Sequence, residues 1–421
     1  MSDTSVTPRA AAARWTCPFC LLLCDTATVQ VDDAGALVLS DGGCACARRA
    51  LARFTARPST ASPRVDGRDC SLDEAVAAAA KCLAASRQPL FGGLGADVSG
   101  ARALYRLACQ TGAICDAADG ESLMTTLRAT QDRGSFFTTL AEVRTRADLI
   151  VCVGGTPVRQ APEFFDRCGV GEPLIAQRRV VLLGGDAADA AVLDGLRTRP
   201  GVTVDAIPLH GDLFATAALL SALVAGRAVR EAPAALQQLA SQLRQARYAV
   251  FAGETRTLPR HGALVVESIH RTVGTLNQST RAAAMWLGGG NGAGTVNQVF
   301  TWLSGLPLRS RAGSLGLEHE PLCFGAQRLL SDAAVDSLLW VSSFDPDLAP
   351  PPTTLPTIVL GHPDLARLPA AVFIPVSTPG IGSPGHLFRA DGSVMLPLFA
   401  LHDDGLPALA GVLDRIAGAL A

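Results

Sequence analysis

The N-terminal stretch Cys17-Pro-Phe-Cys20-Leu-Leu-Leu-Cys24 places three cysteines within eight residues and is the most informative part of this 421-residue sequence. Two more cysteines, Cys44 and Cys46, follow a segment that alternates apolar and polar residues around an Asp-Ala-Gly turn. This alternation predicts a β-hairpin that carries the later cysteines back beside the first three. Four thiolates gathered in this way are able to hold a 4Fe-4S cluster, and the candidate ligands are Cys17, Cys20, Cys24 and Cys44.

The nature of this candidate site is open in two respects. Cys46 is an alternative to Cys44 as the fourth ligand, and the spacing does not choose between them. Zinc is a lesser competitor, because two and then three intervening residues are more typical of iron–sulfur clusters than of zinc ribbons. Buried thiols that bind nothing are the remaining interpretation.

Composition indicates an ordinary globular chain. It is 48% hydrophobic with a net charge of −2, and its length is enough for two or three domains with cores. The balanced charge predicts neither a nucleic-acid nor a membrane partner. The first residues lack the apolar core of a secretory signal, and no apolar run is long enough for a membrane-spanning helix. We therefore expect a cytoplasmic protein, a setting in which clustered cysteines bind metal more often than they form disulfides.

Most of the remaining chain alternates apolar runs with helical patterns. Short apolar runs that lead into glycine or small polar residues occur at residues 89–94, 148–155, 179–185, 248–253, 337–342 and 357–361. Helical spacing is expected at residues 71–83, with Ser71 as the N-cap, and at residues 100–112, 213–229 and 232–246. Continuous apolar strands between helices predict parallel sheets flanked by helices, an α/β fold whose ligands bind at the carboxyl ends of the strands.

Two other patterns invite a functional interpretation that the residues do not favour. The run Gly288-Gly-Gly-Asn-Gly-Ala-Gly294 lacks the Lys and Ser/Thr of a phosphate-binding loop, so a tight turn or close backbone packing is expected. The triplet Glu318-His319-Glu320 has the residue types of a proton-handling cluster, but a solvated loop is the favoured interpretation.

The motif Cys-Pro-Phe-Cys-x-x-x-Cys-Asp at residues 17–25, followed by a hairpin and another cysteine, resembles the N-terminus of molybdopterin oxidoreductases. It is most similar to the B subunit of formylmethanofuran dehydrogenase. The resemblance continues through Leu-Asn-Gln-Ser-Thr-Arg at residues 276–281 and Asn-Gln-Val-Phe-Thr-Trp at residues 297–302. Shorter matches follow in the family's order at residues 344–346, 373–375, 379–381 and 385–392.

This resemblance implies a molybdopterin-oxidoreductase-like multidomain architecture with a small N-terminal Cys-rich β module. The implied division has four parts. Residues 1–56 are the Cys-rich module, residues 57–145 and 246–335 form a discontinuous α/β domain, residues 146–245 form a Rossmann-like α/β domain, and residues 336–421 are a C-terminal α/β segment.

The family's B subunit carries tungsten or molybdenum on two pterin dinucleotides beside a 4Fe-4S cluster, with a cysteine or selenocysteine ligand in a Cys-His-Gly-Pro type segment. The corresponding segment here resembles residues 113–120, in which Cys115 stands at the ligand position and Asp116 replaces the histidine. Both histidines of a second family segment, which resembles residues 155–166, are missing. An Asp adds negative charge to an anionic site and cannot donate as an imidazolium does. The tungsten or molybdenum pterin is therefore expected to be absent.

The bacterial relative of that enzyme is the formyltransferase/hydrolase complex of methylotrophs, which works in formaldehyde oxidation without a redox step. The resemblance thus implies that the chain is the B subunit of such a complex and acts as a non-catalytic scaffold. Its complex would convert formyl-tetrahydromethanopterin to formate through a methanofuran-type carrier, with amidohydrolase, formyltransferase and C subunits as partners. No catalytic residue is assigned to the chain.

Two alternatives remain open. In an active tungsten- or molybdenum-dependent formylmethanofuran dehydrogenase, Cys115 would hold the metal and the four N-terminal cysteines would relay electrons. An electron-transfer subunit would keep the cluster without the pterin. If the carrier's acidic tail crosses this subunit, candidate contacts are Arg256, Arg260, Arg309 and Arg311, because Arg binds carboxylates with two parallel hydrogen bonds; solvated surface is the favoured interpretation of all four.

Overall fold

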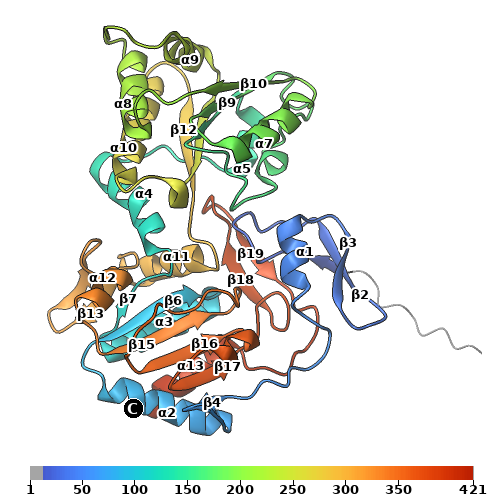
Figure 1. The fold of residues 1–421 in the computed structure, drawn as a ribbon, viewed down its shortest axis with the longest axis vertical. Coiled ribbons are helices and arrows are strands. Elements are labelled where there is room, and N and C mark those ends of the chain that lie inside the picture. Colours follow the sequence, from blue (N-terminus) through green and yellow to red (C-terminus); the bar gives the residue numbers. More distant parts are fainter. Residues whose placement is uncertain (1–12, 421) are drawn as a thin grey trace, which may run out of the picture. The chain divides into compact units, whose positions relative to one another are not determined.

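The computed structural model describes residues 13–420, which form two compact units (Figure 1). Unit 1 comprises Met1–Ala118, Asn291–Leu387 and Met395–Ala421, and unit 2 comprises Asp119–Gly290 and Phe388–Val394. Parallel sheets flanked by helices occur in both units, which confirms the predicted α/β class. Residues 1–12 of the predicted Cys-rich module lie outside the described residues.

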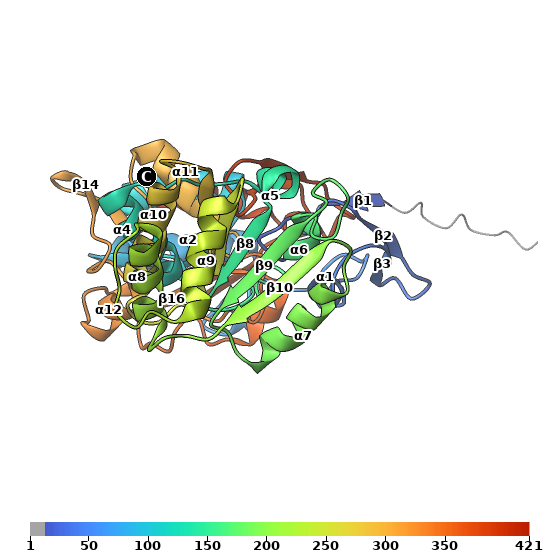
Figure 2. The ribbon, with the colours of Figure 1, turned by 90° about the horizontal axis from the view of Figure 1, so that it is seen from above.

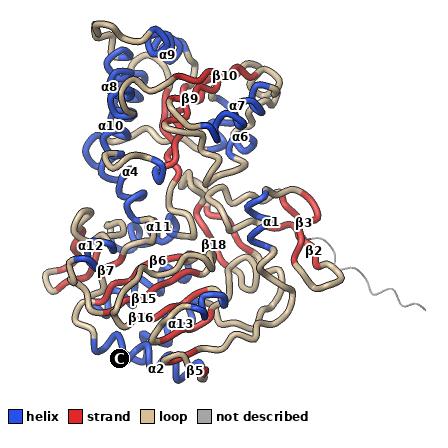
Figure 3. The backbone as a smooth tube through the Cα atoms, viewed as in Figure 1, coloured by secondary structure: helices blue, strands red, loops and turns tan. Residues whose placement is uncertain are grey.

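The N-terminal part of unit 1 is a small antiparallel sheet followed by one helix (Figure 3). Its elements are β1 (Ala13–Trp15), β2 (Ala27–Val31), β3 (Leu37–Asp41) and α1 (Ala45–Leu51). The pairing of β2 with β3 confirms the predicted hairpin. Asp32 forms its turn, because its carboxylate accepts the backbone N–H groups of Ala34 and Ala36. Trp15 is buried in the core of this module and donates its indole N–H to the carbonyl of Gly380 at 2.8 Å.

The main sheet of unit 1 has nine strands in the order β14-β13-β7-β6-β15-β16-β17-β4-β5. Its parallel centre consists of β7 (Ile114–Cys115), β6 (Pro89–Gly95), β15 (Ser337–Ser342), β16 (Thr357–Gly361) and β17 (Val372–Pro375). The edges are antiparallel and consist of β13 (Ser310–Gly313), β14 (Gly316–His319), β4 (Arg64–Val65) and β5 (Arg68–Asp69). Every residue of the central strands is buried, as the continuous apolar runs predict.

Helices of unit 1 cover this sheet. Three of them pack together and contact β6 and β17, namely α2 (Leu72–Ala85), α3 (Val98–Thr111) and α13 (Leu409–Leu420). Ser71 caps α2 as predicted, because its hydroxyl accepts the N–H of Glu74 while the Glu74 carboxylate accepts the N–H of Ser71. The short helix α12 (Ala326–Ser331) and the 3-10 helix η2 (Pro363–Arg367) pack on the core of β15 and β17.

The glycine run of residues 288–294 leads into α11 (Ala293–Ser304). Gly292 is the residue before this helix and has φ +77°, a conformation that L side chains rarely adopt. A Cβ at Gly292 would lie 2.5 Å from the carbonyl oxygen of Ala96. Close backbone packing therefore explains glycine at this position, as expected from the sequence.

Unit 2 is built on a parallel sheet of five strands in the order β10-β9-β8-β11-β12. The strands are β8 (Leu149–Val153), β9 (Arg178–Leu183), β10 (Val202–Ile207), β11 (Ala249–Glu254) and β12 (Ala282–Leu287). The chain builds outward from β8 to one edge and then returns to add β11 and β12 on the other side. The order of strands therefore reverses between β8 and β11, where ligands commonly bind in such sheets.

Helices flank both faces of this sheet (Figure 2). One face carries α8 (Leu213–Val224), α9 (Ala234–Gln245) and α10 (Gly262–Leu276), and α7 (Ala187–Arg197) lies on the other. The remaining helical elements of the unit are α4 (Gly120–Arg133), α5 (Leu140–Arg146), α6 (Phe164–Arg167) and η1 (Thr255–Thr257). Among the helices of residues 13–420, none is long and apolar enough to cross a membrane.

The sheets combine stretches that the predicted four-part division keeps apart. Strands from residues 146–245 and from residues 246–335 lie in the one sheet of unit 2. Likewise, β15 from residues 336–421 pairs with β6 from residues 57–145. Local patterns predict strands but not their partners, because parallel strands pair across long connections.

Candidate functional site

The N-terminal cysteines form a group that we call the thiol cluster, defined as Cys17, Cys20, Cys24, Cys44 and Cys46. The first three lie on a tight loop, in which the N–H of Cys17 donates to the carbonyl of Cys24 at 2.9 Å. Leu23 closes this loop with φ +46°. Cys44 immediately precedes α1, and Cys46 lies in its first turn. The hairpin thus gathers all five cysteines in one small module, as the sequence predicts.

The thiols of this cluster act on one another. Burial raises the pKa of Cys17 well above its usual range, and the neighbouring Cys20, Cys44 and Cys46 add to this effect. A hydrogen bond with Cys24, together with burial, raises the pKa of Cys20. Burial also raises the pKa of Cys46. These three thiols are therefore protonated at neutral pH unless a bound cation stabilises their thiolates.

The thiols of this cluster are not preorganised around a metal ion in the described residues. In residues 13–420, no group of three or more His, Cys, Asp or Glu side chains is placed so that it could hold a metal ion. Cys44 is engaged as the N-cap of α1, since its sulfur accepts the N–H of Ala47 at 3.5 Å. The assignment of Cys17, Cys20, Cys24 and Cys44 to a 4Fe-4S cluster therefore stays a prediction.

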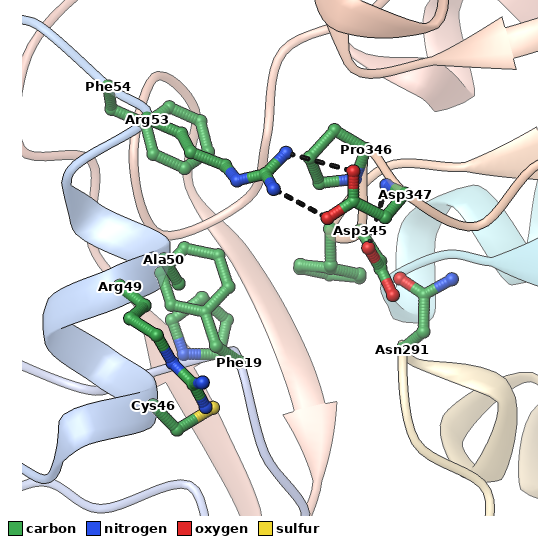
Figure 4. Close-up of a pocket in the computed structure, with 12 residues that line it drawn as sticks. Phe19, Cys46, Arg49, Ala50, Arg53, Phe54, Asn291, Asp345, Pro346 and Asp347 are labelled. Carbon is green, nitrogen blue, oxygen red and sulfur yellow. Dashed lines mark hydrogen bonds and ion pairs between the residues drawn. The ribbon is translucent and has the colours of Figure 1, made fainter.

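A pocket of about 410 Å³ adjoins the thiol cluster (Figure 4). It is lined by Pro18, Phe19, Cys46, Arg49, Ala50, Arg53, Phe54, Asn291, Phe344, Asp345, Pro346 and Asp347. Arg53 reaches across it to Asp347, with Nη2–Oδ2 and Nη1–Oδ1 distances of 2.5 and 3.2 Å. The rings of Phe19 and Phe54 stack at 5.8 Å between centroids. Arg53 and Asp347 thus satisfy one another through paired, charge-assisted hydrogen bonds, and Arg49 and Asp345 are further charged residues of the lining.

The second cysteine segment of interest surrounds Cys115 at the end of β7. The side chain of Cys115 is buried, and burial, followed by the charges of Cys109 and Asp116, raises the pKa of its thiol. Asp116 is 2% exposed and accepts hydrogen bonds from Arg309 Nε at 3.2 Å and from the N–H of Ala326 at 2.8 Å. Both carboxylate oxygens are therefore occupied by groups of the protein itself.

Arg309 completes this buried ion pair. Its side chain is 7% exposed, its Nη1 donates to the carbonyl of Pro321 at 2.5 Å, and its backbone N–H donates to the carbonyl of Cys115. Burial raises the pKa of Asp116, while the charge of Arg309 opposes that shift. The interpretation of Arg309 as solvated surface, or as a contact for an acidic tail, is therefore wrong, because its guanidinium lies inside unit 1.

His319 also differs from expectation. It lies on β14 rather than in a solvated loop, and its Nδ1 is 3.0 Å from the carbonyl oxygen of Arg309. Residues 310–319 fold back as a hairpin through Ser314 and Leu315. The sequence did not predict this hairpin, because glycines flank its turn and interrupt the alternation of apolar residues.

The carboxyl ends of the unit 2 strands hold buried carboxylates. Asp189 is 1% exposed, and its Oδ1 accepts both the N–H and the hydroxyl of Thr156, at 2.8 and 2.5 Å. Glu254 is equally enclosed, and it accepts the N–H of Gln160 at 2.7 Å. Burial raises the pKa of Glu254. The N–H groups of Thr156 and Gln160, which follow β8, thus already donate to carboxylates of the protein. A phosphate at this edge would meet negative charge.

No protein-family profile matches the chain. It is 32% identical over 368 residues to the B subunit of the formyltransferase/hydrolase complex (Fhc) of Methylorubrum extorquens, covering 84% of this chain and 96% of that protein. The chain belongs to the family of Fhc B subunits. This membership confirms the family resemblance predicted from the cysteine motif and the downstream segments.

Two further comparisons agree with this assignment to the Fhc B subunits. The chain is 25% identical over 402 residues to the B subunit of the tungsten-containing formylmethanofuran dehydrogenase 2 of Methanocaldococcus jannaschii, covering 89% and 90% of the two proteins. It also matches a chain in the crystal structure of the formyltransferase/hydrolase complex FhcABCD from Methylorubrum extorquens in complex with methylofuran. That match has a TM-score of 0.74 and 31% identity, and covers 85% of this chain and 98% of the other.

Proposed function

We propose that this chain is a non-catalytic scaffold subunit of a formyltransferase/hydrolase complex. The complex would convert formyl-tetrahydromethanopterin to formate through a methanofuran-type carrier, as part of formaldehyde oxidation in the cytoplasm. Amidohydrolase, formyltransferase and C subunits would be its partners. Support comes from the match to the Fhc B subunit over nearly the whole relative, and from that relative's FhcABCD complex with methylofuran. We also propose that the two units follow the molybdopterin-oxidoreductase-like architecture.

The buried pair of Asp116 and Arg309 is the observation that carries the non-catalytic role. In the related dehydrogenases the segment of Cys115 would face a metal bound by anionic pterin dithiolenes. Here a carboxylate fills the neighbouring position, and both of its oxygens are hydrogen-bonded within the protein. A second anionic group beside a buried carboxylate is strongly unfavourable. The residues of this segment therefore do not fit a tungsten or molybdenum pterin.

The carboxyl edge of the unit 2 sheet supports the same conclusion. A pterin dinucleotide brings phosphate groups, which need free donors and positive charge. Asp189 instead occupies the N–H of Thr156, and Glu254 occupies that of Gln160. Both carboxylates are buried, so their charges are poorly screened.

The proposal is tested by anaerobic co-purification of the chain with its partner subunits, followed by elemental analysis. We expect neither tungsten nor molybdenum in stoichiometric amount, and full formyl transfer and hydrolysis by a complex that contains Cys115→Ala. One tungsten or molybdenum per chain would support the dehydrogenase alternative and reject the scaffold role. A loss of turnover in Cys115→Ala, with all subunits present in unchanged amounts, would reject the non-catalytic role without supporting the dehydrogenase.

The iron content of the same preparation decides the role of the thiol cluster. We propose Cys17, Cys20, Cys24 and Cys44 as the ligands of any iron that co-purifies, because these thiols share one module. A bound cluster would absorb near 400 nm, and Cys20→Ser would abolish that absorbance. Iron-free complex with full activity would show that the thiols bind nothing that the function requires.

A further inference from the structure

Besides the pocket of unit 1, the structure has a hollow in unit 2. No cysteine lines it, and it lies away from the carboxyl ends of the strands. It has a volume of about 260 Å³ and is lined by Thr145, Arg146, Ile175, Arg247, Tyr248 and Arg281. Arg247 and Tyr248 directly precede β11, and Arg281 directly precedes β12. The hollow therefore lies at the amino ends of these strands. We call it the arginine hollow.

Arginines from three separate parts of the chain line this hollow, and its lining contains no carboxylate. The nearest acidic contacts are loose, with Arg146 Nη1 3.8 Å from Glu142 Oε1 and Arg247 Nε 3.7 Å from Asp148 Oδ2. Both distances exceed that of a hydrogen bond. For Arg281, no ion pair is found within residues 13–420.

Asp148 offsets part of the positive charge of the hollow, but its oxygens accept backbone N–H groups rather than hydrogen bonds from a guanidinium group. Oδ2 accepts the backbone N–H of Arg247 at 3.0 Å, and Oδ1 accepts that of Tyr248 at 2.9 Å. Elsewhere in unit 2, guanidinium groups bind carboxylates at hydrogen-bond distance. For example, Arg179 Nη1 lies 2.5 Å from Asp205 Oδ2. Within residues 13–420, no hydrogen bond from the guanidinium groups of these three arginines to the protein is found, so their donors are available to a ligand.

Tyr248 and Ile175 add ring and aliphatic surface to the lining of the hollow. Tyr248 is 6% exposed and donates its hydroxyl proton to Thr138 Oγ1 at 2.7 Å. Burial raises the pKa of Tyr248, the hydrogen bond to Thr138 opposes that shift, and the charge of Glu142 on one side and those of Arg281 and Arg146 on the other make smaller contributions. The three arginines outnumber the two nearby carboxylates, Glu142 and Asp148, so an anion would meet a net positive charge at the hollow.

We propose that the arginine hollow binds a small anion that carries two or more negative charges on phosphate or carboxylate groups. The volume is below the roughly 300–1,000 Å³ of pockets for drug-sized ligands, which favours a compact anion. Guanidinium groups bind phosphate and carboxylate oxygens with paired, charge-assisted hydrogen bonds. This inference does not rest on the proposed scaffold role, since it concerns neither the thiol cluster nor the Cys115 segment.

The test uses the full-length chain and calorimetric titration at constant ionic strength. Pyrophosphate and citrate represent the two anion sources, and acetate serves as a monovalent comparator. We expect saturable binding of pyrophosphate, citrate or both, at least tenfold tighter than any binding of acetate. The stronger of the two responses identifies phosphate or carboxylate as the preferred group. Absence of saturable binding for both would overturn the proposal.

Variants locate the site. The double variant Arg247→Gln/Arg281→Gln should weaken binding about tenfold to a hundredfold, since it removes two positive charges and their charge-assisted hydrogen bonds from a site that is open to solvent. The matched control is Arg227→Gln/Arg230→Gln, which removes two arginines of the same unit that lie outside the hollow and should bind as the parent does. The methyl resonance of Ile175 should shift on titration in the parent chain. Equal affinity in the two double variants, or an unchanged Ile175 signal at saturation, would reject this site.

Discussion

The thiol cluster and the Cys115 segment are the two places in unit 1 where the family resemblance expects redox chemistry, and they differ in how their polar groups are satisfied. Four of the five cluster cysteines are only partly buried, and their contacts are weak ones to each other or to a helix cap. Around Cys115, in contrast, Asp116 and Arg309 are almost fully buried and bind one another. The thiols of the cluster therefore remain available to a ligand, whereas the charged groups beside Cys115 are bound to one another.

We propose that this difference reflects a cofactor site that is closed without the loss of its cysteine. Cys115 is present, and the charge of the neighbouring Asp116 is held in a buried ion pair with Arg309. Reopening that site would require breaking a buried pair, which is far more costly than rearranging half-exposed thiols.

The strongest way to break the comparison is to remove one half of the ion pair. Arg309→Met leaves Asp116 buried without its partner and should lower the free energy of unfolding by about 3–5 kcal/mol, as measured by urea denaturation. Adding Asp116→Asn should recover part of this loss, because a neutral amide is less costly to bury than a carboxylate. Arg328→Met, which removes an exposed pair with Asp332, should cost less than about 1 kcal/mol. Similar costs for the two single variants would show that the pair is not a structural element.

A second test extends the comparison to a buried polar group of unit 2. His270 is 5% exposed and its Nε2 accepts the indole N–H of Trp286 at 3.1 Å. Burial lowers the pKa of His270 to about 4. Between about pH 4 and 6.5 the unfolded chain therefore binds a proton that the folded chain does not, so stability falls as the pH falls through this window. The full effect is about 3 kcal/mol.

His270→Gln isolates this contribution, because glutamine keeps an acceptor for Trp286 but does not titrate. Unfolding free energies of the parent and the variant are compared at pH 7 and at pH 4.5, so that the other titrating groups cancel. The parent should lose more stability than His270→Gln on acidification. A difference between the two proteins that does not change with pH would contradict the neutral, enclosed histidine.

The carboxyl edge of the unit 2 sheet gives a third, smaller test. Asp189→Asn turns one acceptor oxygen into an N–H donor, which must then face either the Thr156 donors or the N–H of Asp186. We expect a loss of about 2 kcal/mol in the free energy of unfolding. Asp194→Asn on the exposed side of α7 is the control and should change stability by less than about 1 kcal/mol. If Asp189→Asn left the free energy of unfolding unchanged, hydrogen bonds within the protein would not be the reason that this edge of the sheet is unavailable to a phosphate.

The smallest expected change in stability concerns the thiol cluster. Cys44 caps α1 through a weak sulfur acceptor, and serine is a better N-cap. If Cys44 binds nothing, Cys44→Ser should stabilise the chain by about 0.5 kcal/mol in thermal denaturation and leave the metal content unchanged. If it is a cluster ligand, iron and stability should both fall. Cys46→Ser, in the first turn of the same helix, separates the two candidates for the fourth ligand.

Local features of the fold were predictable from the sequence because they depend on neighbouring residues. The apolar runs at residues 89–94, 148–155 and 337–342 became buried strands, and Ser71 became the N-cap of α2. The expected helix at residues 213–229 is α8, which ends earlier, at Val224, shortly before Gly226 with φ +73°. Glycine in the left-handed region commonly terminates helices, so the helix end is explained by a residue inside the expected range.

Partners far apart in the sequence were not predictable. Arg309 looked like a surface residue, because the sequence does not show that Asp116 faces it from 193 positions earlier. The pocket beside the thiol cluster was missed for the same reason, since Arg53 and Asp347 are 294 positions apart. The cysteine motif was recognised from its spacing alone, but spacing does not determine whether thiols reach ligand distance.

The pairing of β6 with β15 has a consequence for synthesis on the ribosome. Pro89 in β6 pairs with Ser337, which is translated almost 250 residues later. At roughly 5–20 residues per second, β15 is synthesised about 12–50 seconds after β6. All five strands of the unit 2 sheet emerge during that interval. During that time only β7 pairs with β6, so the edge of β6 that faces β15 stays open to wrong pairing while another sheet assembles.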